Sequence, residues 1–204
     1  EAKNLNAERN PDAMTIASVN NDGQPSARIV LCRKLIPDPG YLVFYTNYKS
    51  KKGTELINNP QAAAVFHWDY LGKQIRIEGL IVKSTEEESD HYFQNRNKGS
   101  QLGAWGSNQS KSIESKEMLM KQISNKANEM NISLKEGTTE ILDSCNINIK
   151  RPPHWGGFRL WAKNIELWIE GKDRIHERGR WSRNIVQSSP SEFTVTPWSG
   201  MRLQ

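Results

Sequence analysis

The chain alternates short apolar runs with turn-forming residues, a pattern typical of antiparallel strands. The first run, at 13–19 (AMTIASV), is followed by an Asp-Gly turn at 20–23 that favours a tight hairpin into the next run, at 28–32 (RIVLC). A third run, at 41–46 (YLVFYT), lies beyond a break rich in proline and glycine. We expect the second and third runs to pair with each other.

Later runs predict a second group of strands. The runs at 61–68 and 74–83 form a pair joined across 69–72. The strand at 74–83 alternates Gln, Arg and Glu with isoleucine and glycine, so one of its faces is polar. The remaining runs predict a terminal meander of three strands, at 158–162, 165–170 and 174–183.

Helix signals lie between the apolar runs. Ser50 is a candidate N-cap of a short helix that Pro60 closes, and 84–87 (STEE) fits a capping box before a helix that runs to about Arg96. The other predictions are a loop or short helix at 100–110, an amphipathic helix at 112–130 and a loop-like stretch at 131–150. We therefore predict a mainly β fold, an antiparallel barrel with helices packed outside, in one domain over 1–204.

Two lysines occupy a place that helices normally disfavour. Lys51 and Lys52 follow the Ser50 cap, in the first helical turn, where unpaired backbone N–H groups already carry a partial positive charge. A bound anion would offset this repulsion, so the pair indicates a candidate phosphate cradle. The alternative is a solvated lysine pair on an exposed turn.

A second cationic feature is predicted near the C-terminus. Strand alternation along 174–183 would place four side chains on one face, Arg174, His176, Arg178 and Arg180. Like charges in a row repel unless a bound anion or acidic partners offset them. The alternative is therefore a salt-bridged surface ribbon in which Glu166 and Glu170 are the partners.

The composition of the chain limits the binding partners and the cellular compartment that we expect. The net charge of +5 suits phosphorylated small molecules, nucleic acid or acidic lipid surfaces. The two cysteines, Cys32 and Cys145, have no metal-ligand or redox spacing, which predicts no metal site and favours a reducing cytoplasm. No signal peptide or membrane-spanning run is visible, and Glu1 is not an initiator residue, so we expect a further N-terminal segment.

Several motifs follow one another between Pro11 and about Arg183. They are RIVLCR (28–33), FYTNYKSKK (44–52), the strand at Gln74, YFQNR (92–96), SQLGAW (100–105), the pair Gln109-Ser110, WGGFR (155–159) and IELWIEGKDRIHER (165–178). The set resembles the pyridoxamine 5′-phosphate oxidase family. The resemblance implies a homodimeric split barrel that binds flavin mononucleotide (FMN) at the subunit interface. It also implies oxidation of pyridoxamine or pyridoxine 5′-phosphate to pyridoxal 5′-phosphate by O2.

The resemblance further implies roles for individual residues. The phosphate and ribityl chain of FMN would be contacted by Arg28, Ile29, Val30, Leu31, Cys32, Arg33, Tyr45, Thr46, Lys51, Lys52, Gln109 and Ser110. The flavin ring would be contacted by Gln74, Trp168 and Arg178. The substrate phosphate would bind Arg33, Tyr92, Arg96 and Ser100, while Arg174 and His176 would lie against the pyridine ring as catalytic residues.

Departures from the family pattern leave other readings open. Position 33 is arginine where the family commonly has lysine, and position 51 is lysine where it commonly has arginine. One alternative keeps FMN but changes the substrate to a related molecule such as a phenazine precursor. The other is a non-catalytic basic β-barrel that binds nucleic acid, which seven tryptophans and excess lysine and arginine allow. The main reading predicts neither nucleic acid nor membrane as a partner.

Overall fold

The computed structural model describes residues 10–135, 137–142 and 147–204. Within these ranges the chain forms two compact units. The sheet unit consists of 10–45, 55–83 and 158–204, and the helical unit of 46–54 and 84–157. The single domain that we expect over 1–204 stays a prediction, and Cys145 lies outside the described residues.

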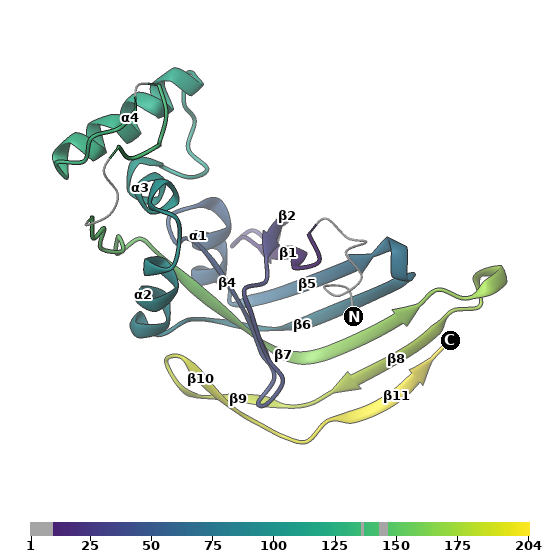
Figure 1. The fold of residues 1–204 in the computed structure, drawn as a ribbon. Coiled ribbons are helices and arrows are strands. Elements are labelled where there is room, and N and C mark those ends of the chain that lie inside the picture. The colour runs from purple at the N-terminus through teal and green to yellow at the C-terminus, as the bar shows by residue number, and fades with distance from the viewer. Residues whose placement is uncertain (1–9, 136, 143–146) are drawn as a thin grey trace. The chain divides into compact units, whose positions relative to one another are not determined.

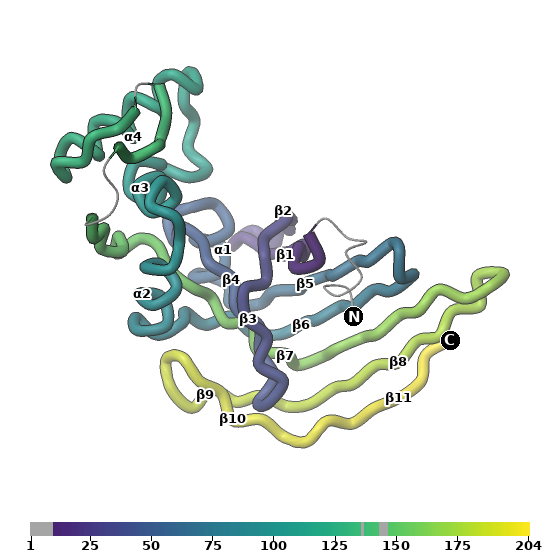
Figure 2. Tube along the Cα trace, in the orientation of Figure 1, coloured from purple at the N-terminus to yellow at the C-terminus, as the bar shows by residue number. Residues whose placement is uncertain are grey.

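The sheet unit is built on one mainly antiparallel sheet with the strand order β11-β8-β7-β6-β5-β1-β2, and β4 pairs with β3 and β7. The neighbouring strands follow a common curve (Figures 1 and 2). The strands of this sheet are β1 (Ala13–Val19), β2 (Pro25–Leu31), β3 (Lys34–Ile36), β4 (Tyr41–Asn47), β5 (Gln61–Trp68), β6 (Lys73–Lys83), β7 (Trp155–Ile169), β8 (Glu177–Ser182) and β11 (Ser199–Leu203). A separate ribbon pairs β9 (Ile185–Ser189) with β10 (Glu192–Val195). The predicted mainly antiparallel β fold is confirmed.

Period-two alternation builds the core of the sheet unit. Strand β1 buries every second residue, so that Met14 and Ile16 are fully enclosed. Phe44 of β4 is also fully enclosed, and its ring lies 5.7 Å from that of Phe158 on β7. Each such buried side chain stabilises the fold by about 1.5–3 kcal/mol. The apolar alternation in the sequence therefore has a direct energetic consequence.

The predicted pairing of the second and third strands was wrong. Strand β2 pairs with β1 along its whole length, from Ala13 opposite Leu31 to Val19 opposite Pro25. Strand β4 pairs instead with β3 (Lys34–Ile36), a three-residue strand that we did not predict. The short turn between β3 and β4 makes this antiparallel pair the more local one, and local pairs close with less loss of chain entropy.

The predicted break at 163–164 was also wrong, because β7 is continuous. Strands β6 and β7 pair throughout, but the register shifts where Gly79 faces Ala162 and Glu78 faces Asn164. The exposed Lys163 is the extra residue of this bulge. A bulge interrupts the alternation of side chains without ending the strand, and this imitates two strands in the sequence pattern.

The strand predicted at 174–183 begins three residues late, at Glu177. The 3₁₀ turn before it holds Asp173 and Arg174 at φ of +56° and +63°. A left-handed backbone does not continue a β ladder. The alternating strip is therefore wrong for Arg174 and His176, which precede the strand.

The described residues of the helical unit form three helices and the start of α1 (Lys51–Asn58). These helices are α2 (Glu86–Gln94), α3 (Lys98–Gly106) and α4 (Lys116–Glu129), and α4 packs against α3. Each begins at a side chain that accepts a backbone N–H, namely Thr85, Asn97 and Ser115 respectively. The helix expected to reach about Arg96 ends at Gln94, and the one expected from 112 begins at Lys116.

The stretch predicted as loop-like, 131–150, has little regular structure where it is described. It contains an isolated bridge between Leu134 and Ile141, and it buries Ile132 and Ile149. These two isoleucines anchor the segment in the helical unit. Among the helices of the described residues, none is long and apolar enough to span a membrane.

Candidate functional site

The start of α1 has the predicted cap. The backbone N–H of Gly53 donates to Oγ of Ser50 over 3.2 Å, and the Ser50 hydroxyl donates to the carbonyl of Asn47 over 2.6 Å. Lys51 is exposed, whereas Lys52 is buried with 8% of its surface accessible. The two lysines therefore lie in different environments.

Lys52 is linked to polar residues, and we call the cradle the set of Thr46, Lys52 and Gln109, joined by hydrogen bonds, with their sequence neighbours Lys51 and Ser110. Nζ of Lys52 donates to Oγ1 of Thr46 over 2.9 Å. The Thr46 hydroxyl donates to Oε1 of Gln109 over 3.4 Å, and the Asn47 N–H donates to the same oxygen over 3.3 Å. Ser110 follows with a left-handed φ of +69°. A buried lysine at a helix N-terminus, hydrogen-bonded to a hydroxyl that in turn meets an amide, suits an oxyanion such as a phosphate.

The RIVLCR sequence lies in the sheet unit, and its first arginine has a structural partner. Arg28 donates from Nη2 to Oε2 of the buried Glu55 over 3.2 Å and to Ser26 over 2.6 Å, and from Nη1 to Ser18 over 2.5 Å. Burial by itself would raise the pKa of Glu55, but hydrogen bonds from Ser18, Ser26 and Arg28, with the charge of Arg28, lower it below its ordinary value. Arg28, itself half-buried, thus forms an ion pair with a buried carboxylate.

The other predicted residues of this region differ widely in exposure. Arg33 is exposed, and Ile29 is 68% exposed. The half-buried members are Val30, Leu31 and Cys32 of the same sequence and Tyr45 of β4. The structure alone assigns them no common ligand.

Three residues predicted to contact the flavin ring lie in one row across the sheet. Gln74 on β6 is directly opposite Trp168 on β7, which is directly opposite Arg178 on β8. Opposed residues of antiparallel strands project from the same face. Arg178 also donates to Oε1 of Glu166 from Nη2 over 2.8 Å and from Nε over 3.1 Å, so one of its predicted acidic partners is confirmed.

A groove of about 720 Å³ opens beside this row, and Trp168, Arg174, His176 and Arg178 all line it. The His176 ring lies 4.5 Å from the Trp168 ring, and its Nδ1 accepts the N–H of Gly171 over 3.2 Å. This hydrogen bond favours the tautomer with the proton on Nε2. A tight turn, and not strand alternation, therefore brings Arg174 and His176 to the groove.

The predicted substrate-phosphate residues Tyr92, Arg96 and Ser100, which we call the clamp, lie around the corner between α2 and α3. The Tyr92 ring is nearly parallel to that of Trp155, at 6.2 Å and 8°, and Cζ of Arg96 lies 4.5 Å from the Trp155 ring. Ser100 lies in the first turn of α3, where its N–H donates to Oδ1 of Asn97 over 2.7 Å.

Two residues of this corner were not assigned a role from the sequence. Gln101 is fully buried, and its Nε2 donates to the carbonyls of Phe93, Gln94 and Arg96 over 2.9–3.0 Å. Gln101 of α3 thereby binds the carbonyl groups at the C-terminal end of α2 and holds the two helices together. Trp155 belongs to the WGGFR motif, but only the fold shows which side chains it meets.

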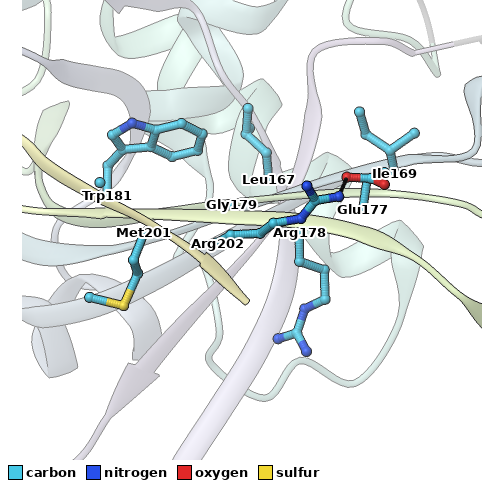
Figure 3. A pocket seen from close by; sticks show the side chains of 9 residues that line it. Leu167, Ile169, Glu177, Arg178, Gly179, Trp181, Met201 and Arg202 are labelled. Atoms are coloured by element: carbon cyan, nitrogen blue, oxygen red, sulfur yellow. Dashed lines mark hydrogen bonds and ion pairs between the residues drawn. The ribbon is translucent and has the colours of Figure 1, made fainter. Parts of the chain in front are cut away.

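An apolar patch lies on β7, β8 and β11; it consists of Leu167, Ile169, Gly179, Trp181 and Gly200. The three large side chains project from one side of the strands (Figure 3) and remain 37–43% exposed. The Trp181 indole covers both glycines, because an added Cβ at either would lie 2.8 Å from it. A groove of about 470 Å³ runs along this patch.

Within the ranges that the structure describes, no cluster of three or more His, Cys, Asp or Glu residues is arranged to hold a metal ion.

Comparison with known proteins places the chain in a family. Residues 2–125 match the family model described as pyridoxamine 5′-phosphate oxidase, and 155–204 match that of the pyridoxine 5′-phosphate oxidase C-terminal dimerisation region. A pyridoxine/pyridoxamine 5′-phosphate oxidase of Burkholderia thailandensis is 46% identical over 179 residues, which cover 88% of this chain and 76% of the relative. One of Burkholderia mallei is 44% identical over 184 residues, covering 90% and 78%.

Two solved structures share the fold. PhzG from Burkholderia lata, solved with tetrahydrophenazine-1-carboxylic acid, aligns with a TM-score of 0.78 at 24% identity, covering 98% of this chain and 86% of PhzG. A pyridoxamine 5′-phosphate oxidase-related, FMN-binding protein from Nostoc punctiforme aligns with a TM-score of 0.68 at 14% identity, covering 98% and 90%. The chain therefore belongs to the pyridoxamine 5′-phosphate oxidase family, a family of FMN-dependent oxidoreductases built on a split barrel.

Proposed function

We propose that this protein is an FMN-dependent oxidase that converts pyridoxamine or pyridoxine 5′-phosphate to pyridoxal 5′-phosphate. The observation that carries the proposal is that one compact unit holds two separate clusters suited to a phosphate, the cradle and the clamp. FMN and the substrate each carry one phosphate. The names of the relatives at 44–46% identity support the same activity.

The cradle is the proposed site of the FMN phosphate. Lys52 supplies a buried positive charge, Thr46 and Ser110 supply hydroxyl groups, and Gln109 supplies an amide. Lys51 contributes a second positive charge from the exposed side of the same helical turn, where water screens it more strongly. The further residues proposed to contact the phosphate and ribityl chain of FMN belong to the sheet unit; they are Arg28, Ile29, Val30, Leu31, Cys32, Arg33 and Tyr45.

The row of Gln74, Trp168 and Arg178 is proposed to contact the flavin ring. Gln74 can donate and accept at a polar ring edge, and Trp168 offers an aromatic face. Arg178 offers a positive charge, and its hydrogen bonds to Glu166 fix the orientation of the guanidinium. These residues orient the ring, while FMN, when bound, accepts the two electrons of the reaction and passes them to O2.

The groove residues Arg174 and His176 are proposed to hold the pyridine ring of the substrate. Within the described ranges Arg174 makes no side-chain hydrogen bond or ion pair, so its guanidinium is available to a ligand. The phosphate would be bound by Arg33 and by the clamp. Oxidation of the alcohol converts CH2OH and O2 to an aldehyde and H2O2, and oxidation of the amine also consumes water and releases ammonia.

A homodimer with FMN at the subunit interface is the proposed assembly. The match of 155–204 to a dimerisation region supports it, and the patch around Trp181 lies wholly inside that region. Exposed apolar surface of this kind is costly in water unless a partner covers it. A second copy of the chain is the proposed partner.

The phenazine-precursor alternative keeps every FMN contact and changes only the substrate. The likeness to PhzG is one of fold, and it does not choose between the substrates. The retained residues Tyr92, Arg96 and Ser100 favour a phosphorylated substrate. Family membership gives the nucleic-acid alternative no support.

A direct assay tests the proposal. The purified protein should be yellow, release FMN on denaturation, and form pyridoxal 5′-phosphate and H2O2 from pyridoxine 5′-phosphate in air. A yellow protein that oxidises only a phenazine precursor would overturn the substrate assignment. A colourless protein that does not bind added FMN would overturn the flavin assignment.

A further inference from the structure

The segment 154–157 contacts Tyr48, a sequence neighbour of the cradle, and also contacts the clamp. The carbonyl of His154 accepts the N–H of Tyr48 over 2.7 Å, and the carbonyl of Gly157 accepts the Tyr48 hydroxyl over 3.1 Å. Tyr48 lies between Thr46 and Lys52 of the cradle. The residue inside this segment, Trp155, packs against the clamp.

Trp155 offers a flat surface to two clamp residues at once. It is 6% exposed, with Tyr92 nearly parallel to its ring and the Arg96 guanidinium over the same ring system at 4.5 Å. Phe93 meets it edge-on at 5.2 Å. An arginine held by a cation–π contact loses less side-chain entropy when it binds an anion than one that moves freely.

The Trp155 backbone is itself anchored. Its carbonyl accepts Nη1 of Arg151 over 2.6 Å, and Arg151 donates from Nε to Asp90 of α2 over 2.6 Å. The Gly157 N–H donates to Ser89 of the same helix over 3.2 Å. Trp155 is thereby fixed to the helix that carries Tyr92.

The contact between the segment 154–157 and Tyr48 is also tight. Gly156 has no room for a side chain, because an added Cβ would collide with the Tyr48 hydroxyl. Burial raises the pKa of Tyr48 to about 12, so this hydroxyl remains a donor to Gly157 at neutral pH. The segment therefore has little freedom to tilt the indole.

We propose that Trp155 is a positioning residue that holds Arg96 and Tyr92 in the geometry that binds the substrate phosphate. This inference rests on the proposed function. Trp155 acts through its neighbours, so its loss should weaken binding of phosphorylated ligands much more than binding of the same ligands without phosphate.

The test compares Trp155→Leu and Trp155→Phe with the unchanged FMN-loaded protein. Calorimetric titration gives the dissociation constants of pyridoxal 5′-phosphate and pyridoxal, and steady-state assays give KM and kcat for pyridoxine 5′-phosphate. We expect Trp155→Leu to raise the dissociation constant of pyridoxal 5′-phosphate and the KM by roughly 2- to 30-fold. Affinity for pyridoxal, kcat and FMN content should change little. Trp155→Phe keeps an aromatic face and should recover part of the loss.

Trp198→Leu is the matched control. The Arg183 guanidinium lies 4.2 Å from the Trp198 ring, so this variant removes the same kind of contact in the sheet unit. It should leave the preference for pyridoxal 5′-phosphate over pyridoxal unchanged.

The outcomes separate the inference from the function on which it rests. If the unchanged protein neither binds pyridoxal 5′-phosphate nor oxidises its precursors, the proposed function fails and the inference fails with it. If the unchanged protein is active but Trp155→Leu has the same phosphate preference, only the inference fails. If Trp155→Leu does not retain FMN, Trp155→Phe decides, and an equal loss of affinity for pyridoxal and its phosphate would overturn the positioning role.

Discussion

Nζ of Lys52 donates a 2.9 Å hydrogen bond to Oγ1 of Thr46, in a site where the lysine is 8% exposed. Lys51, one residue earlier in the same helical turn, is exposed. Desolvation strengthens the attraction between a cation and an anion, because less water screens them. The two lysines should therefore contribute unequally to anion binding.

The first prediction follows from this inequality. Lys52→Ala should weaken FMN binding about ten- to a hundredfold, because a charge-assisted hydrogen bond contributes roughly 1.5–3 kcal/mol. Lys51→Ala should have a smaller effect. Titrations that follow flavin fluorescence measure both, with riboflavin as the control ligand. If the unchanged protein bound FMN and riboflavin with equal affinity, the cradle would not be the site of the FMN phosphate.

The second prediction concerns the ion pair of Arg28 and Glu55. Arg28→Met should destabilise the protein by about 3 kcal/mol at neutral pH, because it leaves a buried carboxylate without its cation. Arg76→Met is the matched control, since Arg76 pairs with Glu78 and Glu166 while 43% exposed, and it should cost less than about 1 kcal/mol.

The same pair predicts a pH dependence of stability. Folding lowers the pKa of Glu55. The ion pair therefore makes its full contribution to stability above the unfolded pKa of about 4.3, and this contribution is lost as pH falls towards the lower folded pKa. The stability difference between unchanged protein and Arg28→Met should shrink below about pH 4. Urea unfolding of both proteins at neutral and acidic pH measures it. A constant difference across this range would contradict the assignment.

The third prediction separates two arginines of one groove. Arg174→Ala should leave the protein yellow but lower turnover of pyridoxine 5′-phosphate, because the substrate loses a group that positions it over the flavin. Arg178→Ala should instead weaken FMN retention. Bound flavin and steady-state kinetics, measured side by side, distinguish the two effects. Full activity of Arg174→Ala would leave that residue without the proposed role.

The fourth prediction tests the apolar patch. Trp181→Glu places a charge among Leu167 and Ile169, so it should shift a dimer towards monomers at micromolar concentration. Val186→Glu changes a residue of β9 that is 67% exposed, and it should leave the dimer intact. Sedimentation velocity measures the assembly state. An unchanged dimer in Trp181→Glu would mean that the subunits meet elsewhere.

Much of the fold was predictable because it follows from local patterns. The strands Ala13–Val19 and Gln61–Trp68 match their predicted ranges, because a strand that buries every second residue has apolar residues at every second position of its sequence. Ser50 was identifiable as a cap because its role depends on backbone groups only three residues away. The family was visible from the order of its motifs.

Three features depended on the tertiary structure. They are the pairing of β4 with β3, the bulge at Lys163 and the left-handed turn at Arg174. In each case the chain could adopt more than one backbone pairing or conformation, and the local sequence does not show which one is the more stable. Arg174 and His176 therefore line one groove because of a tight turn, and not because of the strand alternation that we predicted.

By itself, the sequence determined which residues carry charge and where most of the strands and helices lie, because both follow from residue type and short-range periodicity. Only the tertiary structure decided that Arg28 meets Glu55, that Lys52 is buried while Lys51 is not, and that Trp155 lies under Arg96. Burial and contacts between distant residues depend on how the chain closes on itself. The electrostatic strength of each charge therefore becomes known only when its surroundings are known.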